Sequence, residues 1–202
     1  MKDICKRTTD IILALGCLIV LSPLMLFIYC SIRIAGSAIY RQERIGKGGK
    51  PFLIYKFRSM KVNAEENGIE LLQKENDPRI TRIGRILRKH HLDELPQLIN
   101  VLLGDMSFVG YRPERKHYID QIMQHDPRYE QLYQIRPGIT SYATLYNGYT
   151  DTMEKMLKRL EMDLEYLKHR SWWEDIKIIC LTVFFVATGK NKHNNKGRCA
   201  FE

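Results

Sequence analysis

The chain has 202 residues, enough for one domain with a hydrophobic core, and its formal net charge is +9. This excess of lysine and arginine favours a polyanionic partner: a nucleic acid, an anionic membrane surface or a phosphorylated substrate. The five cysteines have neither CxxC nor zinc-ligand spacing, which argues against a zinc site and predicts buried thiols in a reducing compartment.

The first expected element is an apolar helix over residues 11–32, which contain no charged side chain. As a straight helix it would measure about 33 Å, against about 30 Å for a hydrocarbon core, so a single spanning helix is the default. Ser22 and Pro23 fall in its middle, and proline has no N–H for the Ile19 carbonyl, so a kink is expected there.

Basic residues flank this segment on both sides, whereas a spanning helix usually has them on one side. They are Lys2, Lys6 and Arg7 before it, and Arg33, Arg41, Arg44, Lys47 and Lys50 after it. The proline and the symmetrical charge favour a re-entrant helix hairpin. A kinked spanning helix and a cleaved signal peptide stay open as alternatives.

A β-hairpin is expected next, with strands over about 38–45 and 52–60 joined by the glycine-rich GKGGK. Residues 61–79 are polar and predict a surface excursion with a helical piece. Residues 80–105 alternate at helical spacing until Leu95-Pro96. This predicts one helix that ends near Asp93 and another that starts at Pro96.

An amphipathic helix is predicted within residues 150–173, where methionine and leucine recur at three- and four-residue steps. Thr150 or Asp151 is the expected N-cap. The apolar stretch 176–189 is too short to span a bilayer and follows Trp172 and Trp173, so an interfacial helix and a buried core helix are both open. No internal repeat or second domain is visible.

The residues that carry chemistry lie around HHLDELPQLINVLLGDMSFVGYRPER, residues 90–115. The adjacent carboxylates Asp93 and Glu94 follow a run of five lysines and arginines without a carboxylate. Further cations occur in YKFRSM, GYRPER and IRPGIT, and Arg-Pro fixes the local backbone so that a guanidinium fork can match a phosphate.

Paired carboxylates among so many cations suit a diphosphate substrate. Mg²⁺ is usually held by one or two protein carboxylates and phosphate oxygens. A carboxylate can also attack phosphorus to give an acyl phosphate, and a basic surround with Mg²⁺ favours its ionised form. On these residues alone the simpler interpretation is structural: Asp93 and Glu94 would pair with Arg88 or cap the following helix.

The chain resembles the small monotopic phosphoglycosyl transferases of the bacterial sugar transferase family. The matching motifs are LSPL, QERIGKGGKPFLIYKFRSM, LRKHHLDELPQLINVLLGDMSFVGYRPE, IRPGIT and MDLEYLKHRSWWEDIKI. The resemblance implies an α+β, mostly helical fold with a β-hairpin, in a monotopic membrane domain whose N-terminal re-entrant hairpin breaks at Ser22 and Pro23. We therefore expect a membrane hairpin over 1–37, a catalytic domain over 38–189 and a basic, disordered tail over 190–202.

The implied reaction transfers a sugar-1-phosphate from a UDP-sugar to polyprenol phosphate, usually undecaprenol phosphate, and releases UMP by a covalent two-step route with Mg²⁺. By position, Asp93 matches the nucleophile and Glu94 its metal-binding partner, so both are candidate Mg²⁺ ligands. Four further residues match polar positions of the family site: Lys56, Arg88, Arg112 and Asp163. Arg58 and Arg136 are added as phosphate contacts on their neighbourhood alone.

The same resemblance places the chain at the cytoplasmic face of a bacterial inner membrane, with anionic lipids and downstream glycosyltransferases as partners and no nucleic acid. The stretch SYATLYNGYT departs from the GWAQVNGRN-like stretch of many members, with Thr144 and Tyr149 in place of the usual Gln and Arg. The sugar, the glycoconjugate pathway and the oligomeric state therefore stay open. The alternatives are a membrane-tethered phosphohydrolase and a non-enzymatic basic lipid-binding module.

Overall fold

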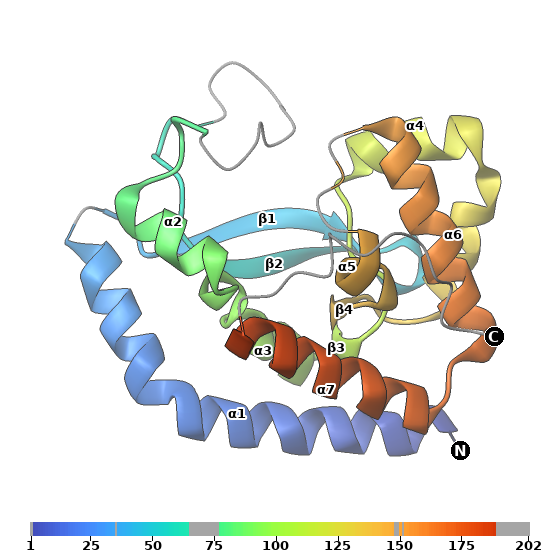
Figure 1. The fold of residues 1–202 in the computed structure, drawn as a ribbon, viewed down its shortest axis with the longest axis horizontal. Coiled ribbons are helices and arrows are strands. Elements are labelled where there is room, and N and C mark those ends of the chain that lie inside the picture. The colour runs from blue at the N-terminus through green and yellow to red at the C-terminus, as the bar shows by residue number, and fades with distance from the viewer. Residues whose placement is uncertain (1, 35, 65–76, 148–149, 151, 189–202) are drawn as a thin grey trace.

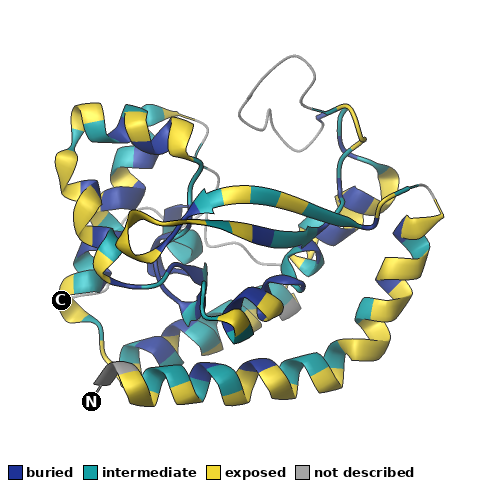
Figure 2. Cartoon of the chain, turned by 180° about the vertical axis from the view of Figure 1, so that it is seen from behind, coloured by how far each residue is buried: buried dark blue, intermediate teal, exposed yellow. Residues whose placement is uncertain are grey.

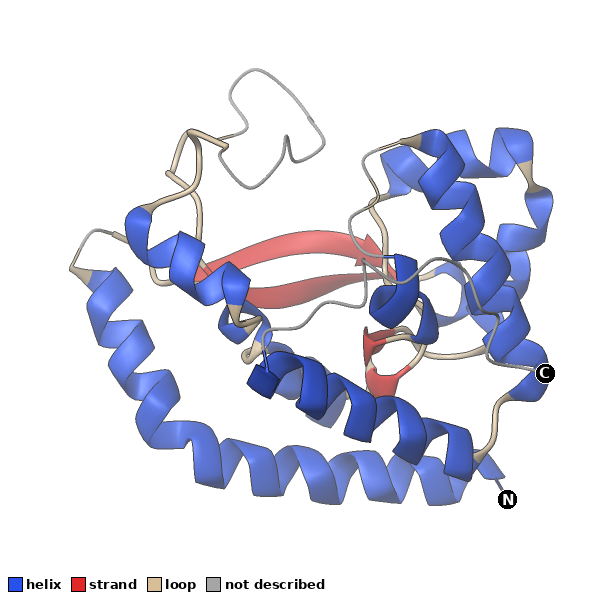
Figure 3. Cartoon of the chain, viewed as in Figure 1, coloured by secondary structure: helices blue, strands red, loops and turns tan. Residues whose placement is uncertain are grey.

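The computed structural model describes residues 2–34, 36–64, 77–147, 150 and 152–188, and helices dominate the described chain (Figures 1 and 3). The elements are α1 (Lys2–Arg33), β1 (Ile39–Ile45), η1 (Lys47–Gly49), β2 (Pro51–Phe57), α2 (Arg82–Lys89), η2 (Leu92–Glu94), α3 (Gln97–Leu103), β3 (Ser107–Val109), α4 (Lys116–His125), η3 (Pro127–Gln134), β4 (Gly138–Thr140), α5 (Tyr142–Asn147), α6 (Met153–His169) and α7 (Trp172–Thr188). The mostly helical fold with a small sheet is therefore confirmed.

Helix α1 has two arms that meet at a bend, one along the base of the molecule in Figure 1 and one rising beside α2. The helix is continuous, with Pro23 inside it, so the expected break takes the form of a bend. Ser22 Oγ donates to the Ile19 carbonyl at 2.8 Å, which satisfies the acceptor that Pro23 leaves without an N–H. The segment Ile4–Arg33 is long and apolar enough to cross a membrane, and only 11% of an apolar 18-residue window within it is buried.

Strands β1 and β2 form the predicted antiparallel hairpin, in register from Ile39 opposite Phe57 to Ile45 opposite Pro51. The turn between them requires glycine, because Gly48 and Gly49 have φ values of 70° and 71°. The second strand ends at Phe57 instead of Met60. Met60 pairs instead with Ile80 in an isolated bridge, so the chain after Phe57 is tied to the entrance of α2.

Helix α2 begins at the N-cap Thr81, whose side chain accepts from the Gly84 N–H at 2.9 Å. The expected helix end near Asp93 is wrong, because α2 already ends at Lys89. His91 then adopts the left-handed conformation with φ 54°, which redirects the chain into the separate turn η2. The predicted second helix start is confirmed, since Pro96 is the N-cap of α3.

Glycine at position 84 lets α2 lie directly on the chain that follows β2. A Cβ at Gly84 would lie 1.9 Å from the Ser59 carbonyl oxygen. A second close approach joins the parallel strands β3 and β4, which pair Ser107 with Gly138 and Val109 with Thr140. There a Cβ at Gly138 would lie 2.2 Å from the Gly110 nitrogen. Both approaches exclude any side chain.

The hydrophobic core has three parts. The largest lies among α4, η3 and α6 and includes Ile119, Leu132 and Leu160. The other two attach the arms of α1, one through Ala14 against α3 and β2, the other through Ile28 against α2. Each arm thus buries a narrow stripe and leaves the rest of its surface exposed (Figure 2).

The C-terminal helices match the predicted positions with two differences. The N-cap of α6 is Thr152, which accepts from the Lys155 N–H at 3.3 Å, and the expected caps Thr150 and Asp151 are wrong. Helix α7 begins at Trp172 and combines both interpretations of its apolar stretch, since Ile178 is buried and Phe184 is exposed. The predicted tail lies outside the described residues, as does the centre of the polar excursion, residues 65–76.

The prediction of buried thiols is wrong. Cys5, Cys30 and Cys180 are exposed and Cys17 is partly buried, and all four are free thiols. The three exposed cysteines lie on surfaces of α1 and α7 that face away from the core, whereas Cys17 packs partly against the cluster around Ala14. Cys199 lies outside the described residues.

Candidate active site

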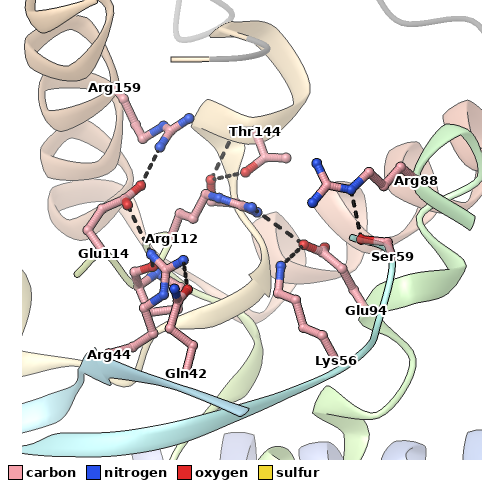
Figure 4. Close-up of polar contacts among 12 residues, drawn as sticks. Gln42, Arg44, Lys56, Ser59, Arg88, Glu94, Arg112, Glu114, Thr144 and Arg159 are labelled. Carbon is pink, nitrogen blue, oxygen red and sulfur yellow. Dashed lines mark hydrogen bonds and ion pairs between the residues drawn. The ribbon is translucent and has the colours of Figure 1, made fainter. Parts of the chain in front are cut away.

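The site is centred on Glu94, which receives cations from two other segments (Figure 4). Lys56, on β2, donates from Nζ to Glu94 Oε1 at 2.6 Å. Arg112, which follows β3, donates from Nη2 to the same oxygen at 3.4 Å. The structure therefore brings together three of the predicted site residues, one each from β2, η2 and the loop after β3.

Asp93 lies beside this pair and is only 7% exposed. The Arg88 guanidinium acts on it electrostatically from α2. Arg88 is held by a hydrogen bond from its Nε to Ser59 Oγ at 2.8 Å, across the contact that Gly84 permits. The close packing of α2 thus positions a third predicted cation next to the predicted nucleophile.

The two adjacent carboxyl groups have pKa values shifted in opposite directions. For Glu94, burial raises the pKa, but Lys56 and Arg112 outweigh it and hold the pKa well below the ordinary range. For Asp93, burial and the neighbouring charge of Glu94 raise the pKa, and Lys56, Arg88 and His91 only partly oppose them. The basic surround alone therefore does not give Asp93 the low pKa that the sequence suggested.

A second charged cluster holds the Arg112 loop from the other side (Figure 4). Glu114 accepts from Arg159 Nη1 at 2.6 Å and from Arg44 Nη1 at 3.2 Å. Arg44 also donates to the Pro113 carbonyl at 3.2 Å and to Gln42 Oε1 at 2.6 Å. This cluster is not among the residues predicted from the sequence, although Glu114 directly follows the Arg-Pro pair.

Asp163 lies on α6, one helical turn after Arg159, and is 2% exposed. Burial raises its pKa to about 7, against the opposing effects of Arg159 and of hydrogen bonds from the Arg112 backbone and the Ser141 side chain. Within the described chain its Oδ1 has no hydrogen-bond partner. Asp163 therefore supports the Arg112 backbone from the core and does not pair with the Glu94 cations.

Arg58 and Arg136 are directed elsewhere. Arg58 Nε donates to the Ser37 carbonyl at 2.8 Å and its guanidinium lies 6.0 Å from the Tyr40 ring. Arg136 Nε donates to the Gly104 carbonyl at 2.8 Å. The two arginines therefore have different partners: Arg112 reaches Glu94, whereas Arg136 bonds to the Gly104 carbonyl.

The divergent stretch after residue 140 forms the short helix α5. Ser141 Oγ caps it by accepting from the Thr144 N–H at 2.9 Å, and the two hydroxyl groups lie 2.9 Å apart. Asn147 anchors its far end by donating to the Lys155 carbonyl at 2.8 Å. Tyr149 lies outside the described residues. Thr144 is thus part of a cap, near the Arg112 loop in Figure 4.

The donor set suits a magnesium ion that arrives with a substrate. Among the described residues no group of three potential metal ligands exists, but Asp93 and Glu94 supply two adjacent carboxyl groups. Glu94 uses Oε1 for Lys56 and Arg112. Mg²⁺ commonly takes only one or two protein carboxylates and completes its shell with phosphate oxygens and water, so this pair fits it.

Comparison with known proteins identifies the family to which the chain belongs. The sequence model of the family described as bacterial sugar transferase matches residues 1–189. The chain is 46% identical over 183 residues to the UDP-glucose:undecaprenyl-phosphate glucose-1-phosphate transferase of Escherichia coli K12, covering 89% of this chain and 39% of that protein. It is 40% identical over 186 residues to the UDP-N-acetylgalactosamine-undecaprenyl-phosphate N-acetylgalactosaminephosphotransferase of Aeromonas hydrophila, covering 91% and 44%.

A third relative has nearly the same length as the matched region. The exopolysaccharide production protein PSS of Rhizobium leguminosarum is 41% identical over 191 residues, covering 91% of this chain and 95% of that protein. Against the first two relatives, in contrast, the chain spans about two fifths of their length. Since the family match covers almost the whole sequence, the chain belongs to the bacterial sugar transferase family.

Proposed function

We propose that this protein transfers a sugar-1-phosphate from a UDP-sugar to undecaprenyl phosphate and releases UMP. The observation that carries the proposal is the buried Asp93–Glu94 pair, with Lys56 and Arg112 on one carboxyl group and Arg88 beside the other. The names of the E. coli and Aeromonas relatives describe this class of transfer.

In the proposed first step, a carboxylate oxygen of Asp93 attacks the sugar-bearing phosphorus of the UDP-sugar. The bond from that phosphorus to the bridging oxygen breaks, and UMP leaves with the bridging oxygen. An acyl phosphate then links Asp93 to the sugar phosphate. In the second step, a phosphate oxygen of the lipid attacks the same phosphorus, and the aspartyl oxygen leaves as a free carboxylate.

The residues around the pair have separate tasks in this scheme. Arg88 and Arg112 neutralise the transferring phosphoryl oxygens, while Lys56 keeps Glu94 ionised as a metal ligand. Held by Asp93 and Glu94, Mg²⁺ would neutralise phosphate charge and offset the burial that raises the Asp93 pKa.

The bend and exposed surface of α1 support a monotopic arrangement at the cytoplasmic face of a bacterial inner membrane, in which both ends of a re-entrant α1 face the cytoplasm. Anionic lipids would contact its basic flanks, and downstream glycosyltransferases would take the lipid-linked product. A variant with Cys5 as its only thiol and another with only Ser37→Cys test this arrangement. A membrane-impermeant maleimide should modify both from the cytoplasmic side, and modification from opposite sides would show a spanning helix.

The chemical step is tested by UMP release without lipid acceptor. Asp93→Asn should abolish release, because it removes the nucleophile. Asp120→Asn should retain it, because Asp120 is an exposed residue of α4 paired only with Lys116 among the described residues. Normal release by Asp93→Asn would refute the nucleophile. A lipid-linked product formed only with polyprenol phosphate separates the transferase from a phosphohydrolase, and a panel of UDP-sugars identifies the sugar.

A further inference from the structure

A second pocket lies at the N-terminal end of α1 and shares no residue with the Asp93–Glu94 site. Its lining comes from α1, the hairpin turn η1, β3, the chain from the end of η3 to β4, α6 and the chain after α6. The lining residues used below are Lys6, Asp10, Lys47, Ser107, Arg136 and Arg170.

The lining is basic, with four cationic side chains and a single carboxylate among these residues. That carboxylate, Asp10, accepts the Phe108 backbone N–H at 3.2 Å and so belongs to the β3 backbone. Arg136 is fixed by its Nε bond to the Gly104 carbonyl at 2.8 Å, which holds the guanidinium plane in place. Lys6 is held by Asp175 at 2.5 Å. The pocket therefore holds positioned positive charge, from the fixed Arg136 and from the exposed Lys47.

Ser107 supplies an independent sign of a ligand. Ser107 is 1% exposed, and within the described chain its Oγ has no hydrogen-bond partner. A buried hydroxyl without a partner costs free energy. Because its neighbours in the pocket are cations, the group best suited to accept from it is an anionic oxygen.

Phosphate esters have the chemistry that this lining recognises. A fixed arginine, the exposed Lys47 and a hydroxyl donor match the several oxygens of one phosphate group. The pocket also borders the start of the apolar segment Ile4–Arg33, and Arg170 is followed closely by the exposed Trp172 and Trp173. Tryptophan pairs and basic residues of this kind are typical of the headgroup level of a membrane.

We propose that this pocket binds a phosphate ester at a second site, separate from the catalytic carboxylates. The phosphate is that of an anionic phospholipid headgroup or of a soluble phosphoester. Its occupation ties the N-terminal end of α1 to the hairpin turn and to the α6–α7 junction.

The test compares two lysines of the same turn. Lys47 lines the pocket, whereas Lys50 does not, and both are exposed, so reversal of either charge leaves the core intact. Ser107→Ala removes only the hydroxyl. The full chain in neutral detergent is titrated with inorganic phosphate while its thermal midpoint is recorded. In parallel, lipid retained from nanodiscs of phosphatidylcholine, with or without phosphatidylglycerol, is counted by native mass spectrometry.

Lys47→Glu and Ser107→Ala should each weaken binding roughly tenfold, as expected for loss of a hydrogen bond to a charged group, and Lys50→Glu should match the wild type. Retained phosphatidylglycerol with this dependence identifies a lipid headgroup, and a phosphate response without retained lipid identifies a soluble ester. Equal weakening by both lysine variants, or binding that neither Lys47→Glu nor Ser107→Ala changes, would overturn the proposal. Catalysis of UMP release is a separate readout, so failure here leaves the transferase proposal intact.

Discussion

Glu94 and Asp163 are both buried carboxyl groups within the region around Arg112, yet their pKa values shift in opposite directions. Glu94 receives side-chain cations from Lys56 and Arg112, which outweigh burial. Asp163 faces the core between α6 and the Arg112 backbone, where burial outweighs Arg159 and the pKa rises to about 7. The difference shows that a close cation on the carboxyl oxygen, more than the total charge nearby, decides whether a buried acid is ionised.

Removal of the closest cation should have the largest effect. Lys56→Met leaves Glu94 with Arg112 at 3.4 Å, so the pKa of Glu94 should rise. UMP release should then fall on the order of 10³-fold, the loss typical of one preorganised charge donor. Lys61→Met, at an exposed lysine on the chain after β2, is the control and should act like the wild type. Full activity of Lys56→Met would contradict the assigned role of Lys56.

The Asp163 side of the comparison predicts a pH dependence of stability. Its raised pKa means that the folded protein keeps a proton that the unfolded chain has lost above its ordinary value of 3.8. The free energy of unfolding should therefore fall as pH rises from about 4 towards 7, by roughly 3 kcal/mol between pH 5 and 8. Asp163→Asn should lack this component. Urea unfolding of both proteins at several pH values measures it, and parallel curves would disprove the shift.

A third change disturbs the packing of α2, which carries Arg88, on the backbone of Ser59. Gly84→Ala places a methyl group 1.9 Å from the Ser59 carbonyl oxygen, so α2 must move away from that backbone. We expect a destabilisation of about 2 kcal/mol and a weaker Arg88–Ser59 bond. Gly16→Ala, at a helical glycine with open space around its Cβ, should be neutral or slightly stabilising. The thermal unfolding midpoints of the two variants measure this difference. Equal midpoints would show that a methyl group fits between α2 and the Ser59 backbone.

The smallest expected effect comes from the turn that presents the carboxylate pair. His91 has φ 54°, a conformation that glycine adopts more readily than any residue with a Cβ. His91→Gly should therefore be more stable than His91→Ala by about 1 kcal/mol. Both variants lose the imidazole, so the comparison isolates the backbone. Urea unfolding measures the difference, and a more stable alanine variant would mean that the turn is not strained.

The sequence predicted those features that depend on local spacing. The hairpin glycines, the methionine and leucine spacing of α6 and the proline before α3 are each visible within a few residues, and each element forms where expected. The left-handed His91 was missed because histidine carries no strong signal for that conformation. The exposure of the cysteines could not be predicted, because an apolar stretch of sequence does not show whether the protein core or its surroundings contact the side chains.

The site residues, too, could be predicted by residue type but not by their contacts, because the contacts depend on the fold. Adjacent Asp93 and Glu94 and their cations stand out as residue types, but the sign of each pKa shift depends on distances across the fold. Arg136 was grouped with Arg112 because both precede proline. Only the folded chain shows that Arg112 reaches Glu94 whereas Arg136 bonds to the Gly104 carbonyl. The Glu114–Arg159 contact joins residues 45 positions apart and has no local signal.

The close approach of Gly110, just after β3, to Gly138 of β4 constrains how relatives of this chain can diverge. Because neither Gly110 nor Gly138 has room for a side chain, the backbone that leads to Arg112 packs directly on the backbone that leads into α5. Insertions or bulky replacements there would displace Arg112 together with the segment that leads into α5. We therefore expect relatives with a different preference for the proposed sugar donor to differ by substitutions on α5. The two glycines and the carboxylate pair should be the same in them.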